Sequence, residues 1–298
     1  MTAVLMRPLM RRLRLTRRGV AFLRVVTDLP TRFARPIPGT SVEVVRAGDI
    51  RGEWVRAPGV GDSDEVVLYM HGSAFTILSA RSHRALVSRL SESTRLPVFS
   101  VDYRLAPEHP FPAAADDVAV AYRHLVGLGY APGKIVFAGD SAGGHLALGL
   151  ALTLARSREI PPAGLVLLSP LVDLSLGLAT TQEAHRPDPL VRAADCRRLV
   201  DLYIAGSDRS DPRITLTLDD VVAFPPTLIQ AGGNEMLRAD AQHLHHVLSA
   251  HGATSYLQIW PGQAHVFQAS LRLPESVAAL RQAASFVRHV LHISSSAK

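Results

Sequence analysis

Short apolar runs alternate with longer amphipathic stretches along most of the chain, from residue 65 onward. The apolar runs predict buried strands at 65–72, 96–103, 134–140, 164–170, 226–233 and 255–260. Helical spacing of apolar positions predicts helices at 82–95, 112–128, 142–156, 236–251 and 274–291. Strands that alternate with helices in this way are typical of an α/β fold, in which helices cover both faces of a mostly parallel sheet.

Two segments interrupt this alternation. Residues 1–40 are basic, and their apolar positions recur every three to four residues, which predicts helix. Residues 172–222 separate two strands and are far longer than an ordinary connection. We expect a single domain over residues 1–298, with these two segments forming a helical cap over the sheet.

Basic charge is concentrated at the N-terminus. Residues 1–36 contain nine arginines and one acid, Asp28, so this segment carries +8. Since the whole chain carries +6, the remainder carries −2, and a nucleic-acid-binding body is excluded because it would be basic. The basic segment could contact an anionic membrane surface or belong to the cap. We favour the cap because Pro8 and Gly19 interrupt its amphipathic stripe.

The composition indicates an ordinary globular protein, with 47% hydrophobic and 19% charged residues. Cys196 is the only cysteine, which excludes an internal disulfide and fits a reducing, cytoplasmic location. Arginines interrupt every apolar run before Val20, so no signal peptide is expected. We expect no membrane span either, because no run approaches the roughly 18 apolar residues that a spanning helix needs.

The motif Gly-x-Ser-x-Gly occurs at Gly139, Ser141 and Gly143, between a predicted strand and a predicted helix. In this context the serine lies on a sharp turn at the carboxyl end of the strand, exposed as a nucleophile. The small neighbours let the strand and the helix pass closely. The amide of Ala142 then opens the helix and can stabilise an oxyanion. Ser141 is therefore the candidate nucleophile.

A second small-residue loop follows the first predicted strand, within the stretch HGSAF at 71–75. A serine hydrolase needs backbone amides that bind the oxyanion of the reacting ester. Gly72, Ser73 and Ala74 are small and follow a strand end, so we expect their amides to complete an oxyanion hole with Ala142.

Three stretches together resemble the hormone-sensitive-lipase-like branch of the α/β-hydrolases, the bacterial carboxylesterases with a GDSAGG turn. They are HGSAF at 71–75, DYRLAPEHPFPAA at 102–114 and GDSAGG at 139–144, and the similarity extends over roughly 60–295. The resemblance implies the α/β-hydrolase fold, a Ser, acid, His triad in that chain order, and a cap formed by the N-terminus and an insertion before the acid strand. The family's usual His-Gly-Gly-Gly is here His-Gly-Ser-Ala.

The resemblance also selects the other two members of the triad. His265 lies in PGQAHVFQ, which resembles the family's His-Gly-Phe site with Val266 in place of the glycine. In GGNEMLRADA, at 232–241, alignment on the Leu-Arg pair places Glu235 at the position of the acid. Asp240 is the alternative, about one turn into the following helix. Glutamate can also accept the imidazole N–H and fix its tautomer.

The sequence thus predicts a serine carboxylesterase that hydrolyses small, short-acyl esters through an acyl-enzyme intermediate. No cofactor and no metal is expected, and the partner is a small-molecule ester. A lactone or N-acetyl amide hydrolase with the same triad is the alternative within this chemistry. A non-catalytic ligand receptor on the same fold is less favoured, because Ser141, Glu235 and His265 occur together. The oligomeric state stays open.

Overall fold

The computed structural model describes residues 16–31, 35–221, 223–270 and 273–296. Residues 1–15 and 32–34 of the basic N-terminal segment, Pro8 among them, therefore lie outside the described residues. No helix within the described ranges is long and apolar enough to span a bilayer.

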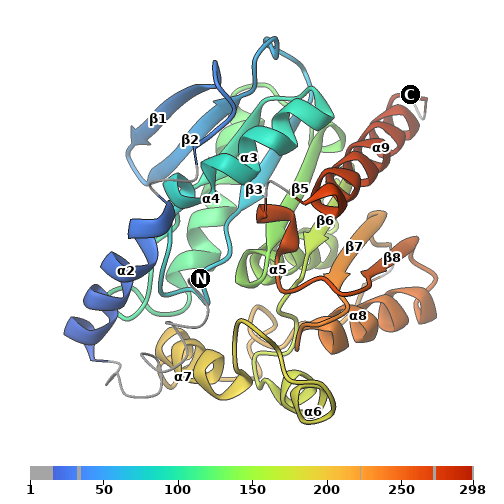
Figure 1. Ribbon diagram of the computed structural model, residues 1–298. Coiled ribbons are helices and arrows are strands. Elements are labelled where there is room, and N and C mark those ends of the chain that lie inside the picture. The colour runs from blue at the N-terminus through green and yellow to red at the C-terminus, as the bar shows by residue number, and fades with distance from the viewer. Residues whose placement is uncertain (1–15, 32–34, 222, 271–272, 297–298) are drawn as a thin grey trace.

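An eight-stranded sheet forms the centre of the protein (Figure 1). Its strands run in the order β1-β2-β4-β3-β5-β6-β7-β8. Their bounds are β1 Ser41–Ala47, β2 Ile50–Arg56, β3 Val66–Met70, β4 Val98–Val101, β5 Ile135–Asp140, β6 Gly164–Leu168, β7 Thr227–Gly232 and β8 Ser255–Trp260. The strand β2 pairs antiparallel with β1 and β4, whereas all pairs from β4 to β8 are parallel. This confirms the predicted α/β fold.

Helices cover both faces of the sheet (Figure 1). On one face lie α4 (Ala113–Gly127), α5 (Ala142–Arg156) and α8 (Arg238–Ala250), and on the other lie α3 (Ala80–Thr94) and α9 (Pro274–Ser296). Residues alternate between the two cores along a strand: Leu68 packs in the first core and Tyr69 in the second. The central strands are buried on both faces, which is why they appear in the sequence as continuous apolar runs.

The insertion 172–222 contains α6 (Gly177–His185) and α7 (Ala193–Ile204), which lie together at one end of the molecule (Figure 1). The helix α7 is anchored to the body through Tyr203, whose ring stacks on Phe75 at 4.0 Å between centroids. The Phe111 amide also donates to the Tyr203 carbonyl at 2.7 Å. These contacts fix α7 against the loops that follow β3 and β4.

The N-terminal helix α2 (Arg17–Thr31) lies beside the body rather than over the insertion (Figure 1). Val20 and Leu23 are fully buried, whereas Phe22 is half exposed. The Arg24 guanidinium donates to the carbonyls of Thr76 and Ala106 and forms an ion pair with Glu108 at 2.7 Å. These contacts attach α2 to residues 105–110, the loop with the sequence LAPEHP.

Candidate active site

Ser141 lies on the sharp turn that joins β5 to α5. Its φ of 51° is in the left-handed region, which a serine adopts only when its surroundings hold it there. The Ser141 amide donates to the Leu168 carbonyl of the neighbouring strand at 2.9 Å. A Cβ on Gly139 would clash with the Gly143 carbonyl, and one on Gly143 with the Met70 carbonyl. Only glycine at these two positions lets helix and strand approach closely enough to hold the turn.

His265 contacts Glu235 across two loops. Glu235 follows β7 and is 1% exposed, and His265 follows β8. The Nδ1 atom of His265 lies 2.5 Å from Glu235 Oε2. Since an ionised carboxylate only accepts hydrogen bonds, Nδ1 carries the proton, which leaves Nε2 of the neutral ring as a base.

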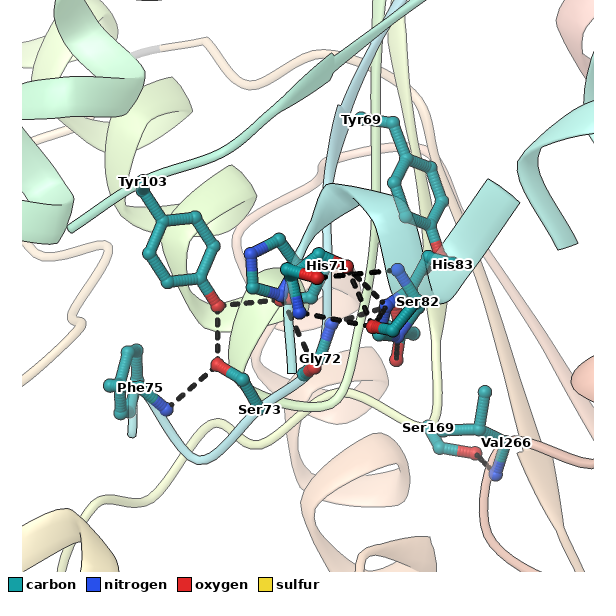
Figure 2. A network of polar contacts seen from close by, with 12 residues as sticks. Tyr69, His71, Gly72, Ser73, Phe75, Ser82, His83, Tyr103, Ser169 and Val266 are labelled. Atoms are coloured by element: carbon teal, nitrogen blue, oxygen red, sulfur yellow. Dashed lines mark hydrogen bonds and ion pairs between the residues drawn. The ribbon is translucent and has the colours of Figure 1, made fainter. Parts of the chain in front are cut away.

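The Glu235 carboxylate is held by two further donors. Its Oε1 atom accepts from the Gly232 amide at 2.5 Å and from the Ser169 hydroxyl at 2.7 Å. The Ser169 oxygen in turn accepts from the Val266 amide at 3.0 Å, a contact drawn in Figure 2. Ser169 thus links the acid to the residue after His265. Sequence reasoning missed it, although a polar residue directly after a buried strand was a usable signal.

The acid–base pair perturbs the pKa of His265. Burial alone lowers this pKa, but the hydrogen bond and the charge of Glu235 raise it more, so the pKa lies above the ordinary histidine value. The side chain is 15% exposed, so the imidazole can reach a bound molecule from its exposed edge.

Asp240, the alternative acid, lies apart from His265 on the first turn of α8. Its Oδ1 atom accepts from the amides of Val172 and Asp173 at 2.9 and 2.8 Å, where the insertion begins. Burial raises the pKa of Asp240 to about 7. Of the two candidate acids, the structure brings only Glu235 to the histidine.

Ser141 and His265 line one cavity of about 450 Å³. Its apolar wall comes from the loop after β3, the insertion and the segments after β7 and β8, and contains Ile77, Leu78, Leu190, Val191, Leu199, Met236, Leu237, Val266 and Ala269. Among the described contacts no hydrogen bond joins Ser141 Oγ to His265, and such bonds commonly tighten only with substrate bound. No described residue of α2 lines this cavity.

Three backbone amides beside Ser141 are available to bind an oxyanion. The amides of Ser73, Ala74 and Ala142 make no hydrogen bond with another described residue, and all three residues lie at or beside the cavity. The expectation for Gly72 requires correction. Its amide donates to Asp140 Oδ1 at 2.9 Å, so this N–H is already engaged and is not free to bind an oxyanion.

The Ser73 side chain belongs to a hydrogen-bonded chain with Tyr103 and His71 (Figure 2). The Tyr103 hydroxyl donates to the His71 carbonyl at 2.6 Å and lies 2.6 Å from Ser73 Oγ. That oxygen also accepts from the Phe75 amide at 3.0 Å. These bonds hold the loop while leaving the Ser73 amide free. Ala74 occupies the left-handed region, with φ 45°, where the family motif has glycine.

Within the described residues, no group of three His, Cys, Asp or Glu side chains is placed to hold a metal ion. Cys196 lines the cavity but is 7% exposed, and burial raises the pKa of its thiol to about 12. A buried thiol with such a pKa is a poor nucleophile at neutral pH.

Comparison with known proteins agrees with this fold. Residues 67–269 match the family model described as "alpha/beta hydrolase fold". A crystal structure of an esterase from the bacterial hormone-sensitive lipase family superposes with a TM-score of 0.88 and 32% identity, and covers 97% of both chains. The chain belongs to the α/β-hydrolase family, in its hormone-sensitive-lipase-like branch.

Relatives with known names point to the enzyme class. The carboxylesterase/phospholipase LipF of Mycobacterium tuberculosis is 40% identical over 278 residues, covering 88% of this chain and 72% of that protein. An acetyl-hydrolase of Streptomyces hygroscopicus is 37% identical over 248 residues, covering 83% and 82%. The chain is a carboxylic ester hydrolase.

Proposed function

We propose that this enzyme is a serine carboxylesterase that hydrolyses small, short-acyl esters through an acyl-enzyme intermediate. One observation carries the proposal: a serine on a strained turn at the end of β5 lines the same cavity as a histidine held by a buried glutamate. A nucleophile, a base and an orienting acid are the three groups that acyl transfer needs.

The geometry supports the following sequence of steps. His265 Nε2 takes the proton of Ser141 as Oγ attacks the ester carbonyl, and the negative oxygen binds the amides of Ser73, Ala74 and Ala142. The imidazolium, stabilised by Glu235, then protonates the departing alcohol as the bond from the acyl carbon to the alcohol oxygen breaks. Water then attacks the acyl carbon with His265 again as base. The bond from the acyl carbon to Ser141 Oγ breaks, His265 returns the proton to Oγ, and the carboxylic acid leaves.

The size and the lining of the cavity support a short acyl chain. Its volume of about 450 Å³ is near the lower end of the range for small-molecule sites, roughly 300–1,000 Å³. Part of its wall comes from residues 190–199 of the insertion, between the β6 and β7 strands. We therefore include 172–222 in the proposal as a cap that limits substrate length. The N-terminal segment 1–40 remains a prediction as the second cap element. The described residues of its helix α2 do not line the cavity.

The proposal is tested with a series of p-nitrophenyl esters from acetate to palmitate. We expect the highest kcat/KM among acetate, butyrate and hexanoate, a steep loss for laurate and palmitate, and a burst of nitrophenol of about one per active chain when deacylation is slow. A preference for the long esters would contradict the short-acyl proposal. Absence of hydrolysis for the whole series would contradict the esterase proposal itself.

The rise of activity with pH is a second expected result. His265 must be neutral to act as a base, and its pKa is raised in the folded enzyme, so the protonated, inactive form persists above the ordinary value of about 6.5. We expect kcat/KM to rise with pH through this raised pKa. Activity that stays constant down to about pH 5 would contradict the role of His265. His265→Ala, whose residual hydrolysis should lack this rise, is the control.

A relative favours one narrower candidate, removal of acetyl groups. The Streptomyces hygroscopicus protein that is 37% identical is named an acetyl-hydrolase. The same nucleophile, base and oxyanion amides could cleave an acetyl ester, an acetyl amide or a lactone, since these differ in the leaving group. Comparing phenyl acetate, acetanilide and a γ-lactone under the same conditions separates the three.

A further inference from the structure

A second buried acid–histidine pair lies beside the nucleophile. Asp140 ends β5, directly before Ser141, and His83 lies on the first turns of α3. The Nε2 atom of His83 is 3.5 Å from Asp140 Oδ2, and the two side chains are 9% and 3% exposed. Both residues line the cavity that contains Ser141 and His265. The mechanism proposed above uses neither of them.

The other oxygen of this carboxylate holds the oxyanion loop. Asp140 Oδ1 accepts from the Tyr69 hydroxyl at 2.6 Å and from the Gly72 amide at 2.9 Å. Gly72 immediately precedes Ser73, whose amide is available for the oxyanion. The position of that loop relative to the nucleophile therefore depends on a side chain adjacent to the nucleophile.

The surroundings of His83 indicate that its ring carries two protons. Its Nδ1 atom lies 3.1 Å from the Ser79 carbonyl oxygen and 3.0 Å from Ser82 Oγ, and Figure 2 shows His83 within this network. A carbonyl oxygen only accepts, so Nδ1 donates to it, while Nε2 faces the carboxylate of Asp140. An imidazolium satisfies both partners at once.

The electrostatics of the pair agree with this protonation. Burial lowers the pKa of His83, but the charge of the nearby Asp140 carboxylate raises it more, so the net pKa is raised. Burial alone raises the pKa of Asp140. The charge of His83 and the two donors on Oδ1 lower this pKa by a larger amount, so the net pKa is lowered. Of the other groups that face the pair, His71 has a pKa of about 3 and stays neutral, and Tyr69 stays protonated. His265 also interacts with the charge of Asp140.

A carboxylate beside an oxyanion hole presents a physical problem. The ester oxygen gains negative charge at the amides of Ser73, Ala74 and Ala142, close to the negative charge of Asp140. Like charges repel strongly where water is excluded, and so an uncompensated Asp140 would oppose the charge that forms in the transition state. A positive ring on its other side removes this conflict and keeps the loop contact.

We propose that His83 is a positioning residue of the hydrolytic reaction. As an imidazolium it holds the Asp140 carboxylate against the Gly72 amide and offsets its charge beside the forming oxyanion. This inference rests on the proposed function, because it assumes that the reaction passes through an oxyanion at these amides.

A double-mutant cycle with His83→Gln and Asp140→Asn tests the proposal. Glutamine at 83 is neutral and leaves the Asp140 charge unopposed, so we expect kcat to fall about 10- to 100-fold with a smaller change in KM, as for other residues that orient a site indirectly. The double variant has no charge at either position, and its Asn Oδ1 can still accept from Tyr69 and Gly72. It should recover most of the loss.

The pH profile supplies a measurement that simple loss of packing would not change. As pH rises through the raised pKa of His83, the ring loses its charge, so kcat/KM of the wild type should decline on the alkaline side. This decline should be absent from His83→Gln and from the double variant. The matched control is His245→Gln, which should keep the wild-type profile. His245 contacts the hydroxyl of Ser255 at the start of β8, the opposite end of that strand from His265.

Several outcomes would overturn the role of His83. They are wild-type kcat in His83→Gln, additive losses in the double variant, or an alkaline decline that persists without the His83 charge. If His83→Gln does not fold, Asp140→Asn decides alone, because its alkaline decline should also vanish. Failure of the proposed function is seen separately, as full activity in Ser141→Ala, whereas failure of this inference leaves the Ser141 dependence intact.

Discussion

Replacement of Ser141 by alanine is expected to lower kcat for ester hydrolysis by about 10⁴- to 10⁶-fold, because the variant lacks the Oγ atom that forms the acyl-enzyme in the proposed mechanism. The fold should be retained. The Ser141 contacts that hold the turn are made by its backbone, with the Leu168 carbonyl and the Leu171 amide, and an alanine keeps them. Steady-state kinetics with p-nitrophenyl butyrate and a thermal unfolding curve measure the two effects.

Ser270→Ala is the matched control for this variant. Ser270 lines the same cavity, but its side chain is exposed and no hydrogen bond from its hydroxyl occurs among the described residues. We expect it to hydrolyse the ester at a rate close to that of the wild type. If Ser141→Ala kept more than about 1% of the wild-type kcat, the nucleophile would have to be sought elsewhere.

Replacement of Glu235 by glutamine should lower kcat/KM by roughly 10³- to 10⁴-fold, the loss typical of a triad acid. The carboxylate accepts three hydrogen bonds, from the Gly232 amide, the Ser169 hydroxyl and His265 Nδ1. A glutamine has one acceptor oxygen and an NH₂ group. If the NH₂ group faces His265, it favours the wrong tautomer; if it faces Gly232, two donors meet.

Asp240→Asn makes the same chemical change five residues away. The Asn Oδ1 atom can accept from the Val172 and Asp173 amides as the aspartate does, so we expect a change in kcat/KM of only a few-fold. Comparing the two variants under identical conditions therefore separates the loss of the charge on the acid from a general disturbance of this region. A severe loss in Asp240→Asn together with a mild one in Glu235→Gln would transfer the role of the acid to Asp240.

The periodic elements of this fold could be predicted from sequence because burial on both faces leaves continuous apolar runs. Each predicted strand from residue 65 onward corresponds to a strand of the structure, with ends that differ by at most two residues. The hairpin of β1 and β2 was missed. Charged residues such as Glu43, Arg46 and Arg51 interrupt its apolar positions, and β1 lies largely exposed at the edge of the sheet. An exposed edge strand carries little hydrophobic pattern.

The residues of the site that have local motifs were predicted, whereas those that act through tertiary contacts were not. The turn at Ser141 is encoded within five residues of sequence. The donation from Gly72 to Asp140 joins positions 68 residues apart, and Asp188, fully buried, accepts from the Met236 amide across 48 residues. No local spacing reveals such pairs. His83 was missed for the same reason, whereas Ser169 had a local signal, its position directly after the buried strand β6, that was not used.

Covalent labelling with diethyl p-nitrophenyl phosphate tests the nucleophile, and with it the central claim, most directly. The reagent phosphorylates an activated serine and releases nitrophenol, and the modified residue is located by peptide mass spectrometry. We predict one phosphoryl group per chain, located on Ser141, with loss of esterase activity in proportion to labelling and no labelling of Ser141→Ala. Labelling of another residue in proportion to the loss of activity would contradict the account.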